Sequence, residues 1–254
     1  MGVVQGLTEF LPISSSGHLV VAEAAVGMTT PGVVVEVVLH VATLLAVVIV
    51  YWKVLWGLLR GAVSGDGAAW RYIGLLAIGT VPAAAAGLLL EDFFERAFDS
   101  LLLVGVNFLI TGVVLWSTRT VVARAQRPSP TAKGAIGIGM AQALAILPGI
   151  SRSGTTVTVG LWLGVDAVRA AEFSFLLAIP VIGGAAVLQI PDLSAGMGAI
   201  GAFPLAAGFV AALLSGVFAI RLLIALLRKQ AFHRFAPYCW GIGVVTIVFA
   251  LVSA

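Results

Sequence analysis

The feature that most constrains this chain is a series of apolar segments of eighteen or more residues. They occupy residues 32–59, 69–90, 99–118, 168–190, 201–227 and 236–253. A segment of this length and composition spans a bilayer as a helix. Soluble domains need more than the 10% charged residues found here, and the apolar residues do not alternate as in outer-membrane barrels. We therefore predict an all-α polytopic membrane protein, in which residues 1–254 form a single transmembrane domain with six transmembrane helices.

The charges between these segments are sorted by sign. Basic residues predominate in 60–71, 119–133 and 228–234, whereas acidic residues predominate in 91–99 and 191–200. The positive-inside rule predicts that the three basic connections face the cytoplasm, and that the two acidic ones and both termini lie outside. A net charge of +3 gives no reason to expect a nucleic-acid partner, so the bilayer is the expected environment.

Two further apolar segments, 1–27 and 134–165, are interrupted near their middles by LPISSSG and LPGISRSG. Each flank is too short to cross, because at about 1.5 Å per residue it covers only half to two-thirds of a bilayer. Broken backbone at membrane depth is tolerated only where protein or a watery cavity covers it. We expect two re-entrant helix hairpins whose tips meet in the interior.

The two interruptions are related to each other. Residues 2–17 and 139–154 share, at a fixed offset, Gly2, Gln5, Leu7, Ile13, Ser14, Ser16 and Gly17. Three crossings separate the hairpins, so the second should enter from the opposite face. Inverted repeats of this kind are typical of transporters whose site lies near the midplane. We expect repeat halves at about 1–118 and 134–254, joined by a basic cytoplasmic loop at 119–133.

Arg152 is the most informative ionisable residue within the apolar segments, because charge is costly in lipid and is usually functional there. It lies at the second tip, flanked by the hydroxyl side chains of Ser151, Ser153, Thr155 and Thr156. A guanidinium fork beside a helix N-terminus is typical of a phosphate site. The alternative is a structural ion pair between Arg152 and Glu9 or Glu23. Both interpretations require the tips to touch.

The first hairpin supplies a carboxylate, hydroxyls and a histidine. Gln5 and Glu9 are i, i+4 neighbours on one helix face, and Ser14–Ser16 and His18 follow at the break. These groups can activate an oxygen and protonate a leaving group. A carboxylate facing phosphate would repel it unless a divalent cation lay between them, and Mg²⁺ usually binds through one or two carboxylates plus substrate phosphates.

Three more polar residues belong to an outer layer of the predicted site. Glu36 and His40 are also spaced i, i+4. They either line the same cavity or pair with each other, and we favour pairing. Gln142 is the repeat counterpart of Gln5 and is assigned to the same outer layer.

Two motifs resemble a known family. Residues 2–20, GVVQGLTEFLPISSSGHLV, resemble the [E/Q]-x-x-x-E motif and serine–histidine segment of the undecaprenyl pyrophosphate phosphatase family, the bacitracin-resistance type. Residues 147–156, LPGISRSGTT, are similar to its P-G-x-S-R-S-x-x-T motif. The resemblance covers nearly the whole chain and extends to FHRFAPYCW at 232–240.

The resemblance implies an enzyme of the bacterial plasma membrane with its active site open to the outer side. Its substrate would be a polyisoprenyl pyrophosphate lipid, undecaprenyl pyrophosphate. Hydrolysis would yield undecaprenyl phosphate and inorganic phosphate, which recycles the carrier lipid of cell-wall peptidoglycan synthesis. The family is metal-dependent, so the expected cofactor is Mg²⁺ or Ca²⁺. A homodimer is left open.

By this resemblance, Gln5 and Glu9 occupy the metal-binding positions, Ser15 the nucleophile position and His18 the acid/base position. Arg152 is the catalytic phosphate ligand. The other predicted phosphate-binding residues are Ser14, Ser16, Ser151, Ser153, Thr155 and Thr156. Many members have glutamate where this chain has Gln5, which leaves Glu9 as the main carboxylate of the metal site.

Two questions stay open at the level of the sequence. The first is the nucleophile: either Ser15 attacks phosphorus, or water activated by Glu9 or His18 does so while Ser15 only binds the phosphate. The alternative function is an inverted-repeat transporter or flippase of a lipid phosphate. A third class, lipid phosphatases with an S-R-x(5)-H-x(3)-D segment, is rejected because SRSGTTVTVG contains neither the histidine nor the aspartate.

Overall fold

The computed structural model describes residues 1–26, 33–189 and 201–253. The described residues form helices joined by short connections. The α-helices are α1 Gly2–Phe10, α2 Ser15–Val26, α3 Val33–Val50, α4 Trp52–Val63, α5 Gly67–Leu89, α6 Glu91–Phe98, α7 Leu101–Ser117, α8 Ala132–Leu144, α9 Arg152–Trp162, α10 Ala167–Leu188, α12 Ala202–Arg228 and α13 Ala236–Val252. Short 3₁₀ helices lie at η1 Thr118–Thr120, η2 Val122–Arg124 and η3 Phe232–Phe235. The predicted all-helical class is confirmed.

Several helices begin where the sequence provides an N-cap. Asp66, Ser100, Thr131 and Asp166 each accept a hydrogen bond from a backbone N–H in the first turn of α5, α7, α8 and α10. Such caps satisfy donors that a helix leaves without partners at its start. Because these residues stand between apolar segments, they set where each long helix begins.

Five of the six predicted crossings are single helices long and apolar enough to cross a membrane. These are Gly67–Leu89, Leu101–Thr120, Ala167–Leu188, Ala202–Arg228 and Phe232–Val252. The predicted crossing at 32–59 is a bent pair of helices: α3 and α4 meet at 74° at Tyr51, which is the geometry of a broken span or of a re-entrant loop. Tyr51 has φ −100° and ψ 17°, and α4 has no buried residue. The basic side chains Lys53 and Arg60 make α4 amphipathic, so it turns away from the helix packing that buries α3.

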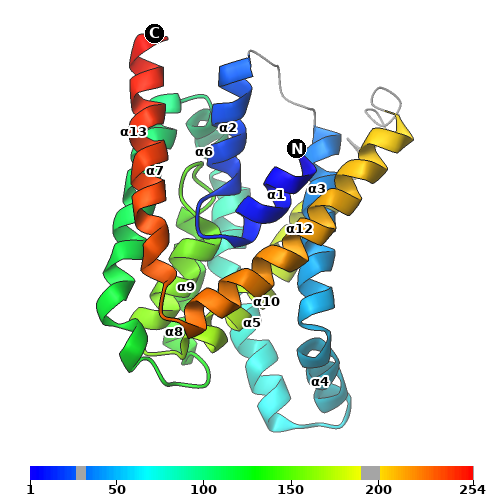
Figure 1. Ribbon diagram of the computed structural model, residues 1–254. Coiled ribbons are helices and arrows are strands. Elements are labelled where there is room, and N and C mark those ends of the chain that lie inside the picture. The colour runs from blue at the N-terminus through cyan, green and yellow to red at the C-terminus, as the bar shows by residue number, and fades with distance from the viewer. Residues whose placement is uncertain (27–32, 190–200, 254) are drawn as a thin grey trace.

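The predicted sorting of charged connections is visible in space. In Figure 1, the α4–α5 turn, the segment between α7 and α8, and the α12–α13 connection lie toward the lower end of the molecule. The connections around α6 and the C-terminus lie at the upper end. The basic connections thus lie opposite the acidic one at 91–99, while the acidic connection at 191–200 falls outside the described residues.

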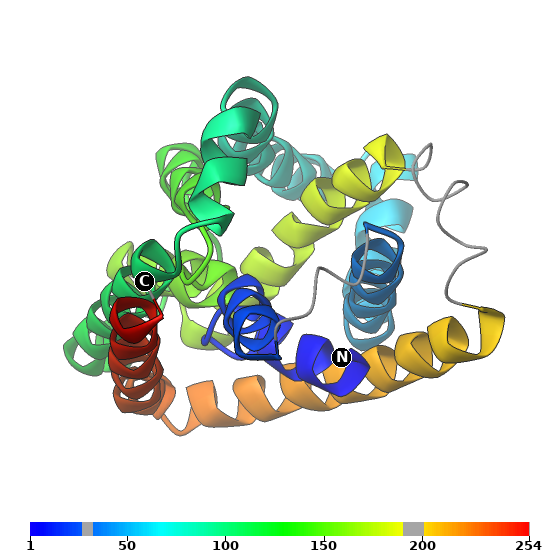
Figure 2. The same ribbon diagram turned by 90° about the horizontal axis from the view of Figure 1, so that it is seen from above.

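Both interrupted segments are broken helices. Residues 11–14 separate α1 from α2, and residues 145–151 separate α8 from α9. In Figure 1, α1 and α2 run down to their break and up again, whereas α8 and α9 run up to theirs and down again. Figure 2 shows the same elements from above, with α12 crossing beside α1. The two broken pairs therefore reach the middle of the molecule from opposite ends.

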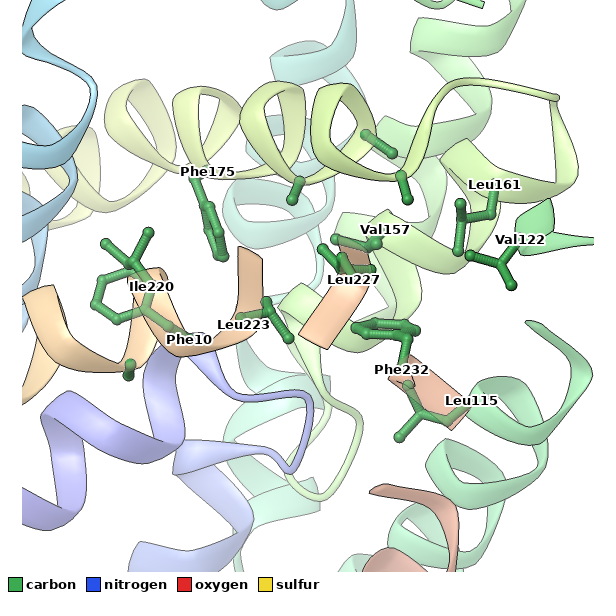
Figure 3. Packing of buried hydrophobic residues seen from close by; sticks show 14 of the residues in the cluster. Phe10, Leu115, Val122, Val157, Leu161, Phe175, Ile220, Leu223, Leu227 and Phe232 are labelled. Carbon is green, nitrogen blue, oxygen red and sulfur yellow. The ribbon is translucent and has the colours of Figure 1, made fainter. Parts of the chain in front are cut away.

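A buried apolar cluster fixes the first broken pair. Phe10, the last residue of α1, packs edge-on against Phe175 of α10, with ring centroids 5.4 Å apart. Ile220 and Leu223 of α12 belong to the same cluster (Figure 3). Since lipid tails are as apolar as these side chains, close packing rather than burial from water stabilises such contacts. Because Phe10 follows Glu9 directly, this packing fixes the position of the Glu9 carboxylate.

Candidate active site

The tips of the two broken pairs touch, as predicted. The Gly149 N–H donates to Ser14 Oγ at 3.2 Å, and Ser153 Oγ donates to the Leu11 carbonyl at 3.2 Å. Arg152 on the second tip donates through Nη2 to Glu9 Oε1. Residues about 140 positions apart in the chain thus form one buried polar centre.

The two tips are built in the same way. Ser14 Oγ accepts from the Gly17 N–H at 3.3 Å, and Ser151 Oγ accepts from the Gly154 N–H at 3.1 Å. Both serines cap the helix that follows, and they are counterparts in the sequence repeat. Ser14 has φ 66°, a left-handed conformation that is uncommon outside glycine. This strained residue directly precedes Ser15, and strained backbone is often found at functional sites.

Glu9 is the centre of the hydrogen-bond network. Its side chain is buried, and its Oε2 accepts from Ser15 Oγ at 2.7 Å and from Gln5 Nε2 at 3.2 Å. Its Oε1 accepts from Arg152. A buried carboxylate needs such partners to offset the cost of removing it from water. The network thus holds a hydroxyl and a guanidinium in contact with one carboxylate.

Glu9, Ser15 and Arg152 line a cavity of about 230 Å³. The predicted site residues among its lining are Glu9, Ser14, Ser15, Ser16, His40, Gln142, Ser151 and Arg152. The rest of its wall is mostly apolar, with Ala83, Ile146, Ile150 and Val181 among the contributors. Both broken pairs therefore contribute polar groups to one cavity.

Three predicted phosphate ligands are not among the lining residues of this cavity. Thr155 Oγ1 donates to the Ser151 carbonyl at 2.8 Å. Thr156 Oγ1 donates to the Arg152 carbonyl at 2.6 Å and lies 2.6 Å from Ser174 Oγ of α10. The Ser153 hydroxyl is directed to the Leu11 carbonyl. In this structure these hydroxyls stabilise the tip, and their predicted contact with phosphate stays a prediction.

His18 lies outside the lining of the cavity. Its Nδ1 is 2.7 Å from the Ser14 carbonyl oxygen, and its Nε2 is 2.7 Å from the hydroxyl of Tyr238 on α13. The rings of His18 and Tyr238 are stacked at 5.7 Å. Both ring nitrogens thus have partners, and the contact of His18 with Tyr238 was not predicted from the sequence.

His40 lines the cavity, and the favoured side-chain pair with Glu36 is not what the structure contains. His40 Nδ1 contacts the main-chain carbonyl of Glu36 at 2.8 Å, while its Nε2 lies 3.9 Å from Glu9 Oε2. The i, i+4 spacing places the His40 ring beside the main-chain carbonyl of Glu36 rather than its side chain. This contact uses Nδ1, so Nε2 faces Glu9. Glu36 lines a small neighbouring cavity together with Gln5 and Glu23.

Asn107 and Thr111 of α7 support the second tip, and the sequence analysis missed them. Asn107 Nδ2 donates to the Pro148 carbonyl at 2.8 Å. Thr111 Oγ1 donates to the Gly149 carbonyl at 2.8 Å and accepts from the Ser151 N–H at 3.1 Å. The sequence does contain a sign of their role, because Asn107 and Thr111 are polar residues spaced i, i+4 in a largely apolar helix.

Glu9 and Gln5 are the residues beside the tips whose oxygens are suited to a divalent cation. Gln5 Oε1 is buried and has no hydrogen-bond partner among the described residues, and its Nε2 contacts Glu9. Within the described ranges, no group of three or more His, Cys, Asp or Glu side chains could hold a metal ion. One carboxylate and one amide oxygen are a donor set that Mg²⁺ accepts when phosphates complete it.

Comparisons with known proteins show the family of this chain. The family described as "Bacitracin resistance protein BacA" matches residues 1–245. A protein of Desulforapulum autotrophicum named undecaprenyl-diphosphatase is 35% identical over 278 residues, which cover 100% of this chain and 97% of the relative. Proteins of the same name from Desulfosudis oleivorans and Desulfatibacillum aliphaticivorans are 43% and 40% identical, and their matches cover 97% and 98% of this chain and 95% and 96% of the relatives.

The matches run from the first broken pair through the second and on to α13. They therefore include both tips that build the cavity, and they confirm the resemblance drawn from the two motifs. The chain is a multi-pass membrane protein that belongs to the BacA, or undecaprenyl-diphosphatase, family.

Proposed function

We propose that this protein hydrolyses undecaprenyl pyrophosphate to undecaprenyl phosphate and inorganic phosphate. The observation that carries the proposal is the contact of Ser15 and Arg152 with the same buried carboxylate, Glu9, at the wall of one cavity. The names of the full-length relatives support the same substrate and reaction.

Arg152 is the phosphate ligand in this proposal. Its Nη2 contacts Glu9, and its Nη1 is buried without a hydrogen-bond partner among the described residues. A guanidinium with an unused donor in a buried cavity can bind a phosphate oxygen and stabilise charge that develops there. The Arg152–Glu9 contact also keeps the guanidinium in place before substrate arrives.

Ser15 is positioned to attack and Glu9 to take its proton. Ser15 Oγ loses its proton to Glu9 Oε2, forms a bond to the terminal phosphorus, and the bond to the bridging oxygen breaks. Undecaprenyl phosphate departs with that oxygen. Water then attacks the phosphoserine, its proton passes to Ser15 Oγ, inorganic phosphate leaves, and the proton held by Glu9 leaves with the products.

A second route uses water directly. In that route Glu9 takes a proton from water as the water oxygen bonds to the terminal phosphorus, and Ser15 only donates to the phosphate. The bond from that phosphorus to the bridging oxygen breaks, undecaprenyl phosphate leaves with this oxygen, and the proton held by Glu9 leaves with the products. In the structure the His18 ring contacts Ser14 and Tyr238, so protonation of the leaving group by His18 requires its ring to exchange partners. The tests of Ser15 below separate the two routes.

Glu9 and the Gln5 amide oxygen are the residues that would hold Mg²⁺ or Ca²⁺. The bound ion neutralises phosphate charge next to the carboxylate. This chain has glutamine at position 5, so it would contribute a single carboxylate and one neutral amide oxygen to the metal.

In the membrane, α1–α2 and α8–α9 form re-entrant hairpins of an inverted repeat, with halves at about 1–118 and 134–254. Their approach from opposite ends of the molecule supports this arrangement. The cytoplasmic end carries the basic connections, by the positive-inside rule. Both termini then face outside, and the site opens to the outer side of the bacterial plasma membrane.

The alternative is a transporter or flippase of a lipid phosphate, and the broken helices favour it. A Glu9–Ser15 contact is not needed for transport, so hydrolysis accounts for more of the site. Vesicles that contain Glu9→Ala protein would translocate a labelled lipid phosphate only if transport exists as a second activity.

The test is phosphate release by purified protein from undecaprenyl pyrophosphate in detergent with Mg²⁺. We expect turnover by the unmodified protein, and none above background for folded Glu9→Ala and Arg152→Ala variants. A folded variant with full activity would remove that residue from the mechanism, and an inactive unmodified protein would contradict the proposed reaction.

A further inference from the structure

Gln142 is a buried amide whose polar atoms have no partner. It lies on α8, is 3% exposed, and neither Nε2 nor Oε1 has a hydrogen bond to any residue that the structure describes. Buried side-chain amides nearly always have partners, so an exception indicates a group that something else satisfies. Gln142 lines the cavity that also holds Glu9 and Arg152.

The internal repeat explains why this amide is free. Gln142 is the counterpart of Gln5, and Gln5 Nε2 donates to Glu9 one helical turn later. The counterpart of Glu9 in the second half is Ile146, which also lines the cavity. The second half therefore retains the amide and lacks the carboxylate that would engage it.

The second half instead contributes positive charge to the cavity. Arg152 is the counterpart of Ser15, and its Nη1 is also buried without a partner among the described residues. The lining of the cavity thus includes two residues with buried, unpartnered donor groups, Gln142 and Arg152. Donors of this kind bind anionic oxygens, and charge-assisted hydrogen bonds are the stronger ones.

We propose that Gln142 is a direct phosphate ligand of the substrate, with its side-chain N–H₂ donating to a non-bridging oxygen of the pyrophosphate. This rests on the proposed hydrolysis and adds a binding residue to it. An amide binds the phosphate without adding a charge that would compete with Arg152 for Glu9. The ligand class is a phosphate or pyrophosphate group, whatever its lipid.

Replacing Gln142 should lower activity without lowering stability. Methionine has nearly the shape of glutamine and no polar group, so Gln142→Met removes an unpaired buried amide from the substrate-free protein. The melting temperature of Gln142→Met should equal or exceed that of the unmodified protein. Its kcat/KM should fall about tenfold to a hundredfold, the usual effect of losing a hydrogen bond to a charged group. The kcat/KM of Gln142→Glu should fall further, because its carboxylate would face the phosphate.

The experiment measures phosphate release from undecaprenyl pyrophosphate, inhibition by inorganic phosphate and thermal unfolding for Gln142→Met and Gln142→Glu. Gln126→Met makes the same chemical change in an exposed loop and should leave all three unchanged. A folded Gln142→Met protein with lower kcat/KM and weaker inhibition by phosphate would support Gln142 as a phosphate ligand.

Two results would overturn the proposal. One is a Gln142→Met protein with unchanged kcat/KM and inhibition. The other is a marked loss of its melting temperature, which would give the amide a structural role. Either is separate from failure of the proposed function, because that failure appears as an inactive unmodified protein.

Discussion

Thr111 holds the backbone of the second tip, and replacing it by valine should displace Arg152. The Thr111 hydroxyl donates to the Gly149 carbonyl at 2.8 Å and accepts from the Ser151 N–H at 3.1 Å. Thr111 is fully buried, so Thr111→Val leaves both backbone groups without partners at almost unchanged volume. The next residue after Ser151 is Arg152, so the loss acts directly on the proposed phosphate ligand.

The size of the effect follows from these two contacts. Each buried group left unsatisfied costs about 1–3 kcal/mol, and interhelical hydrogen bonds in membrane proteins average about 0.6 kcal/mol. A middle value for the pair is about 2 kcal/mol, which shifts the balance between ordered and displaced tips by roughly thirtyfold. A displacement of about 1 Å at a catalytic group costs about a hundredfold in rate. We expect kcat/KM to fall by about thirty- to a hundredfold.

The assay is phosphate release from undecaprenyl pyrophosphate, with circular dichroism to verify the fold. Thr111→Ser keeps the hydroxyl and should restore most of the activity. Thr246→Val is the matched control, since Thr246 is equally buried but its hydroxyl donates only to the Ile242 carbonyl of its own helix. Unchanged kcat/KM in Thr111→Val, or an equal loss in Thr111→Ser, would refute the reasoning.

Three further predictions concern the nucleophile, the contact of the tips and the metal. Ser15→Ala should lower turnover by at least about a thousandfold if Ser15 attacks phosphorus. Turnover of the variant within tenfold, together with no phosphoserine in the unmodified protein by mass spectrometry, would favour water. Gly17→Ala should lower the melting temperature and activity, because a Cβ there would lie 2.6 Å from Phe108 Cζ and 2.9 Å from Gly149 Cα; an unchanged protein would argue against this contact. A chelator should abolish phosphate release and Mg²⁺ should restore it; full activity in the chelator would exclude the proposed metal.

The helical architecture was largely predictable, because segment length and apolarity decide which helices can cross a bilayer. The bend at Tyr51 was not, since α4 is still rich in apolar residues and its amphipathic pattern appears only when Lys53 and Arg60 are placed on a helix. Hydropathy averaged along the chain reports burial in lipid or protein without distinguishing a straight crossing from a bent pair.

The contact between Glu9, Ser15 and Arg152 could be predicted because the internal repeat and the two breaks bring the tips together. The surroundings of His18 and His40 could not. Tyr238 lies 220 residues from His18, and the rotation of α3 that turns His40 toward Glu9 depends on packing against α10 and α12. Spacing along a helix identifies which residues share a face, but neighbouring helices decide what that face meets.

We infer that the two broken helix pairs hold one phosphate together. A double-mutant cycle of kcat/KM for phosphate release, with Glu9→Gln, Arg152→Lys and the double variant, tests it most directly. Arg152→Lys removes the planar fork, and Glu9→Gln removes the base and the ion pair. If both residues act on one phosphate, the double variant loses about as much kcat/KM as the more damaged single variant. Losses that multiply, or a folded single variant with full activity, would contradict the shared site.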